Sequence, residues 1–91
     1  MCNKFPLGHV VATPAALEAL AEAGQTPEFF LDKHVTGDWG EVCPQDKELN
    51  DQALVVGARV LSAYRTLHNV RLWIITEADR SSTCLLLPEE Y

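Results

Sequence analysis

Basic residues are scarce in this 91-residue sequence, which has 7 lysines and arginines against 13 aspartates and glutamates and a formal net charge of −6. A chain with this charge repels phosphate, so we expect no direct binding to nucleic acid. No apolar run approaches the length of a membrane span, and none near Lys4 suits a signal peptide. We therefore predict a cytoplasmic protein that does not enter a membrane.

Cysteine is also sparse, and the three cysteines stand at no paired spacing, which argues against a disulfide framework. The histidines and cysteines show no zinc-ligand spacing, so we expect no metal. A P-loop and a dinucleotide fingerprint are both missing, so we expect no cofactor. The residues concerned are Cys2, Cys43, Cys84, His9, His34 and His68.

The apolar residues, 47% of the chain, are enough for one modest core, so we treat residues 1–91 as a single domain. Helix signals recur in the first half, where a polar or small residue precedes a proline and a glycine follows one helix length later. They predict helices that begin at Pro14, Pro27 and Pro44 and stop before Gly24, Gly37 and Gly57.

Strand signals dominate the second half. Residues 70–77 are dense in β-branched and aromatic side chains and apolar on both faces, which predicts a central strand with Trp73 buried. We interpret residues 59–66 as its hairpin partner, although the same residues also fit a continuation of the third helix. With strands at 7–12 and 83–87, we predict an α+β fold of order β-α-α-α-β-β-β. Two or three short helices would pack on a three- to four-stranded antiparallel meander.

Acidic residues gather between positions 38 and 51, where five acids face one lysine. Such a stretch is typical of a solvated surface, and it also suits a patch that meets a basic partner. We predict that a partner binds the acids Asp38, Glu41, Asp46, Glu48 and Asp51.

Two other clusters could carry chemistry. One comprises His34, Asp38, Glu77 and Arg80, which would be the catalytic residues if the protein is an enzyme. In this cluster the carboxylate of Asp38 could orient the imidazole of His34. The second, at the end of the central strand, comprises Thr76, Glu77, Asp79 and Arg80. Helix capping by His34 and turn capping by Asp79 explain the same residues structurally, and we favour those roles.

Three arginines could share one face of the predicted hairpin and bind an anion, although pairing with the surrounding acids is the interpretation that we favour. They are Arg59, Arg65 and Arg71.

Four segments together resemble a family of small bacterial proteins found in phages, plasmids and genomic islands. They are residues 34–40 (HVTGDWG), 61–64 (LSAY), 73–83 (WIITEADRSST) and 86–91 (LLPEEY). Members are often labelled as a type I restriction methylase subunit. The present chain lacks the Asn-Pro-Pro-Phe/Tyr type of motif that such an enzyme uses, so the resemblance implies a setting in mobile elements and no methylation.

Small acidic proteins of mobile elements often block host defence, as anti-CRISPR and anti-restriction proteins do. The resemblance therefore implies non-catalytic binding to a host protein complex with a basic nucleic-acid-binding surface. The element order is also similar to that of RelE-like ribonuclease toxins, which are basic. A small hydrolase or ribonuclease-like toxin is accordingly one alternative, and a homodimeric interaction module is another. The sequence leaves monomer and homodimer open.

Overall fold

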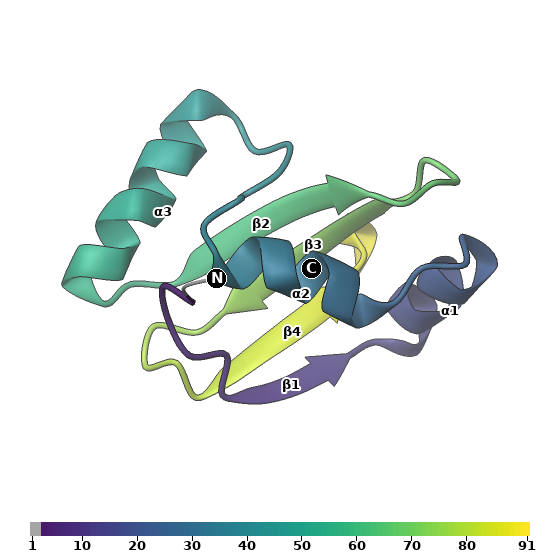
Figure 1. Ribbon diagram of the computed structural model, residues 1–91, viewed down its shortest axis with the longest axis horizontal. Coiled ribbons are helices and arrows are strands. Elements are labelled where there is room, and N and C mark those ends of the chain that lie inside the picture. Colours follow the sequence, from purple (N-terminus) through teal and green to yellow (C-terminus); the bar gives the residue numbers. More distant parts are fainter. Residues whose placement is uncertain (1–2) are drawn as a thin grey trace.

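The computed structural model describes residues 3–91 (Figure 1). Its elements are β1 (His9–Ala12), α1 (Pro14–Glu22), α2 (Pro27–Val35), α3 (Pro44–Val56), β2 (Val60–Arg65), β3 (Arg71–Thr76), β4 (Ser82–Leu86) and the short 3-10 helix η1 (Pro88–Glu90). This order confirms the predicted α+β fold, with three α-helices and one four-stranded sheet in the described residues.

Each of the three α-helices begins at a proline, as predicted, because the fixed φ of proline suits the first helical position and its missing N–H has no partner to lose there. At α1 the side chain of Thr13 accepts a hydrogen bond from the Ala16 N–H at 3.1 Å. α3 ends at Gly57, whose φ of 76° lies in the left-handed region that glycine adopts without strain.

The sheet has the strand order β1-β4-β3-β2, so β3 is internal, as its two apolar faces predicted. Residues 60–65 form β2, which confirms the strand interpretation for the ambiguous segment. β2, β3 and β4 make the antiparallel meander, and β1 joins it in parallel with β4, so the complete sheet is mixed. The three helices between β1 and β2 give the chain the length that a parallel pairing requires.

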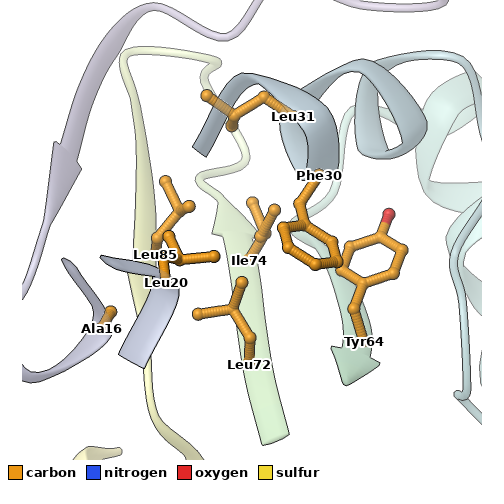
Figure 2. Close-up of a cluster of buried hydrophobic side chains, with 8 residues drawn as sticks. All are labelled: Ala16, Leu20, Phe30, Leu31, Tyr64, Leu72, Ile74 and Leu85. Carbon is orange, nitrogen blue, oxygen red and sulfur yellow. The ribbon is translucent and has the colours of Figure 1, made fainter. Parts of the chain in front are cut away.

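The main core lies between one face of the sheet and the helices α1 and α2, as Figure 2 shows. Alternate residues of β3 supply Leu72 and Ile74, which are both fully buried. Phe30 of α2 packs against the ring of Tyr64, with 5.3 Å between ring centroids. The whole cluster comprises Ala16, Leu20, Phe30, Leu31, Tyr64, Leu72, Ile74 and Leu85.

A second buried cluster joins α3 to the rest of the molecule. It consists of Phe5, Trp39, Ala53 and Val60, with the rings of Phe5 and Trp39 stacked at 6.1 Å. Only one side of α3 contributes to it, and Figure 1 shows this helix standing beyond the β2 edge rather than across the sheet.

Asn50 of α3 closes part of the exposed edge of β2. Its side-chain N–H donates to the Leu61 carbonyl at 2.7 Å, and its side-chain oxygen accepts from the Leu61 N–H at 3.1 Å. One buried amide thus replaces a missing neighbouring strand at this position and fixes the distance of α3 from the sheet.

The segment before α3 closes the next position of the same edge. The Ala63 N–H donates to the Trp39 carbonyl at 3.0 Å, and the Glu41 N–H donates to the Ala63 carbonyl at 2.6 Å. Between them, Gly40 lies so close that a Cβ there would stand 2.0 Å from the Ala63 carbonyl oxygen. Only glycine permits this approach, which holds the loop before α3 against β2.

Replacing Asn50 with leucine should lower the free energy of unfolding by about 1–3 kcal/mol, because the backbone N–H and the carbonyl of Leu61 both lose their partner. Urea unfolding of the variant and the parent measures this difference. Gln52→Leu, at an exposed position of the same helix, is the control and should stay within about 0.5 kcal/mol of the parent. Equal stability of Asn50→Leu and the control would contradict this role for Asn50.

Candidate functional site

Two adjoining hollows lie beside α3, where the helix passes the face of the β2–β3 hairpin that points away from α1 and α2. The first has a volume of about 210 Å³, and its lining includes Glu41, Asp46, Leu61, Arg71 and Trp73. The second, of about 240 Å³, is lined by Asp46, Leu49, Asn50, Arg59 and Leu61. Because the hollows share Asp46 and Leu61, we call them together the α3 groove.

Strand alternation gives the groove its floor. Trp73 points away from the main core because its neighbours Leu72 and Ile74 point into it. Its ring meets the edge of the Tyr91 ring, with 5.7 Å between centroids, and the Tyr91 hydroxyl accepts a hydrogen bond from Arg59 at 2.8 Å. Trp73 is only partly buried, so the expectation of a buried Trp73 is wrong.

Two exposed apolar side chains lie on one side of α3, and one of them lines the groove. Leu49, which lines the second hollow, is 56% exposed, and Val56 is 74% exposed. These two residues are seven positions apart and therefore share one side of the helix. Large apolar side chains exposed together are typical of surfaces that other molecules cover.

The five acids predicted to bind a partner do not form one patch. Asp46 lines the groove, while Glu48 and Asp51, which are two and five positions further on, lie on other sides of the helix and do not line it. Asp51 also accepts a hydrogen bond from the Trp39 indole N–H at 3.0 Å, which gives it a structural role.

The remaining two predicted acids pair with cations of this chain. Glu41 binds Arg65 at 2.8 Å, and Asp38 lies 3.7 Å from the ammonium of Lys33. Asp46 has no ion pair among the residues that the structure describes, and it stands in the first turn of α3, where the helix dipole favours a negative charge.

A third hollow, of about 310 Å³, lies between α2 and the β2–β3 turn. Its lining includes Lys33, Asp38, Glu41 and Arg65, which are the members of those two ion pairs. Because the charged side chains of this hollow already form ion pairs with one another, it offers a ligand fewer unpaired charged groups than the α3 groove does.

His34 belongs to a buried hydrogen-bond chain. Thr83 Oγ1 donates to the Leu7 carbonyl oxygen at 2.7 Å, so it can accept from Thr76 Oγ1, also at 2.7 Å. Thr76 Oγ1 then accepts from the Nε2–H of His34 at 2.9 Å, and Nδ1 of the neutral ring accepts from the Ser62 hydroxyl. A carbonyl at one end, which can only accept, thus sets the direction of every bond in the chain.

The pKa of His34 is lowered from 6.5 to about 4. Burial is the main cause of this shift, and the nearby positive charge of Arg80 is the second. Edge contacts with the rings of Phe5 and Trp39, at 5.2 and 5.7 Å, surround the imidazole with apolar groups. The ring is therefore neutral at pH 7 and joins α2 to the sheet.

The four residues proposed for an enzyme have separate roles. Both ring nitrogens of His34 are occupied, and Asp38 pairs with Lys33 rather than with the imidazole. Arg80 donates to the Ala58 carbonyl at 2.7 Å and the Ala53 carbonyl at 3.2 Å at the end of α3. The side chain of Glu77 is exposed.

The cluster at the end of β3 forms a turn. Thr76 is buried in the His34 chain, whereas Asp79 is exposed and its carboxylate accepts from the Ser81 N–H at 3.0 Å. Hydrogen bonds from the side chain and the backbone of Ser81 lower the pKa of Asp79. Arg80 follows with a φ of 60°, which is uncommon outside glycine and asparagine. The geometry is that of a capped turn.

The three arginines line three different hollows and have different partners. Arg59 bonds to Tyr91 and Arg65 to Glu41, while Arg71 lines the first hollow.

Within residues 3–91, no group of three or more His, Cys, Asp or Glu side chains could hold a metal ion. Cys2 lies outside the described residues; Cys43 and Cys84 are free. No helix in the described part of the chain has both the length and the apolar character needed to cross a membrane. Comparison of the chain with protein-family models, curated proteins and solved structures yields no match.

Sequence reasoning considered Arg71 only as part of an anion-binding set, and it did not place Trp73, Leu49 or Tyr91 at a candidate site. One signal was available: in the central strand an arginine and a tryptophan stand two positions apart, so they share a face, and a charged residue on that face indicates that it is partly open. The contribution of Tyr91 depends on how the segment after β4 folds back, which no local pattern indicates.

The pKa of His34 predicts how stability depends on pH. The folded-state pKa of about 4 lies below the ordinary pKa of 6.5. Between pH 4 and pH 6.5, His34 therefore binds a proton in the unfolded chain but not in the folded protein. The free energy of unfolding should therefore be fully retained above pH 6.5 and fall by about 3 kcal/mol towards pH 4.

The ring resonances of His34, followed by NMR, provide the site-specific measurement and should keep the neutral form down to about pH 5. The carboxyl groups with lowered pKa values, Asp79 and Glu90, affect stability only as the pH falls through their ordinary values of 3.8 and 4.5. Protonation of the His34 ring near pH 6.5 in the folded protein would contradict the buried hydrogen-bond chain.

Proposed function

We propose that this protein acts by binding another protein, without catalysis, and that the α3 groove is the contact surface. The observation that carries this proposal is the combination in one place of a partly exposed Trp73, an exposed Leu49 and the unpaired carboxylate of Asp46. Interfaces typically place aromatic and aliphatic anchors inside a charged rim, and this groove has the same arrangement.

The charge of the chain indicates the kind of partner. The net charge is −6, and α3 carries Asp46, Glu48 and Asp51 against Lys47 alone. A surface with this balance attracts a basic surface over the range of the Debye length and accelerates association with it.

A basic surface that normally holds nucleic acid is the partner class that we favour. The resemblance of the motifs in residues 34–40, 73–83 and 86–91 to small proteins of phages, plasmids and genomic islands supplies this setting. In such a mobile-element setting, the protein would work in the cytoplasm by occupying the nucleic-acid site of a host defence complex, as anti-CRISPR or anti-restriction proteins do. The acidity of α3 supports this mode because carboxylates compete with phosphate for the same cations.

The catalytic alternative has less support from the geometry. His34 has no free ring nitrogen, and the guanidinium of Arg80 is engaged by backbone carbonyls. To act as a general base, His34 would first have to give up a buried hydrogen bond.

The test is capture of a partner from a host lysate by the immobilised protein, with and without a polyanion competitor. The captured protein should be a nucleic-acid-binding protein that high salt and the polyanion both release, since they screen or occupy its basic surface. The double variant Asp46→Asn/Glu48→Gln should slow association with the purified partner roughly tenfold at low salt.

The matched control is Glu18→Gln/Glu22→Gln, which makes the same change in net charge on the exposed side of α1, away from the groove. Its association rate should stay close to that of the parent. Equal slowing by the two double variants would contradict the groove as the contact surface. Capture that neither salt nor the polyanion weakens would contradict the basic partner.

A further inference from the structure

The first hollow of the α3 groove has the size of a site for one side chain. Its volume of about 210 Å³ is too small for a helix or strand and sufficient for one long residue. Val42 and Leu61 contribute apolar wall, Trp73 contributes an aromatic surface, and Glu41 and Asp46 contribute carboxylates. A long side chain with an apolar stem and a charged head matches this order of surfaces.

One carboxylate in the lining of the hollow is free to pair with a cation. Two carboxylates line it against the single cation Arg71. The Asp46 carboxylate is not used in any ion pair within the described residues, whereas Glu41 already pairs with Arg65. An incoming positive group would therefore find the free carboxylate of Asp46 in the same lining as an indole ring.

We propose that this hollow accepts an arginine side chain of the partner, with its guanidinium stacked on Trp73 and paired with Asp46. This inference rests on the proposed function and names the contact that anchors it. Arginine is favoured over lysine because its planar guanidinium both stacks on an aromatic ring and forms two parallel hydrogen bonds to a carboxylate. Arginine is also among the residues that contribute most to interfaces and to nucleic-acid sites, so a basic partner surface can supply it.

The two tryptophans make the test specific. Trp73 lines the hollow, whereas Trp39 is 3% exposed and its indole N–H is bonded to Asp51. An acetylated and amidated oligo-arginine peptide, titrated at low salt, should shift the NMR signal of the Trp73 indole N–H and leave that of Trp39 in place. Oligo-lysine of equal length should bind about threefold or more weakly, and oligo-citrulline, which is uncharged, should not bind.

Variants then locate the contact. Asp46→Asn should weaken binding of oligo-arginine by about fivefold or more, whereas Glu48→Gln, with the same charge change on another side of α3, should weaken it by at most about twofold. Trp73→Leu keeps an apolar floor and should abolish the preference for arginine over lysine. Thermal melts of each variant establish that it is folded before its affinity is compared.

The outcomes separate this inference from the proposed function. Equal losses for Asp46→Asn and Glu48→Gln, with the Trp73 signal unmoved, would overturn the arginine site and leave diffuse attraction to a basic surface standing. Failure of both cationic peptides to bind at low salt would overturn the arginine site and remove the electrostatic basis of the proposed function as well.

Discussion

The position of α3 depends on the hydrogen bonds that Asn50 and the loop before the helix make with the outer edge of β2. An open strand edge needs partners for its peptide groups, and here a helix side chain and a short loop supply them. Because these bonds hold α3 beside the sheet, the helix does not cover the outer face of the hairpin. The α3 groove and its partly exposed Trp73 are a direct consequence.

The opposite face of the sheet is fixed by the buried chain from Leu7 through Thr83, Thr76 and His34 to Ser62. Polar groups buried this deeply are tolerated because each has a partner, and no buried side-chain polar atom is left without one in the described residues. The chain ties α2, three strands and the segment before β1 together. One face of the sheet is thereby committed to stability, and the proposed contact surface lies on the other.

Much of the fold followed from local signals in the sequence. The prolines at positions 14, 27 and 44 and the left-handed Gly57 marked the helices, and the two apolar faces of residues 71–76 marked a central strand. The parallel pairing of β1 was not predictable, because it depends on where three helices return the chain. The roles of Asp51 and His34 were also missed, since their partners Trp39, Ser62 and Thr76 meet them only after the helices pack. Asp46 was among the predicted partner-binding acids, but its distinction from Glu48 required the orientation of α3.

The most direct test of the account is amide hydrogen exchange of this protein with and without its purified partner. Protection should appear in residues 41–56 and on the strands β2 and β3 around Leu61 and Trp73, with α1 and β1 unchanged. Protection confined to α1, β1 or the hollow beside α2, with α3 exchanging as in the free protein, would contradict the α3 groove as the binding surface.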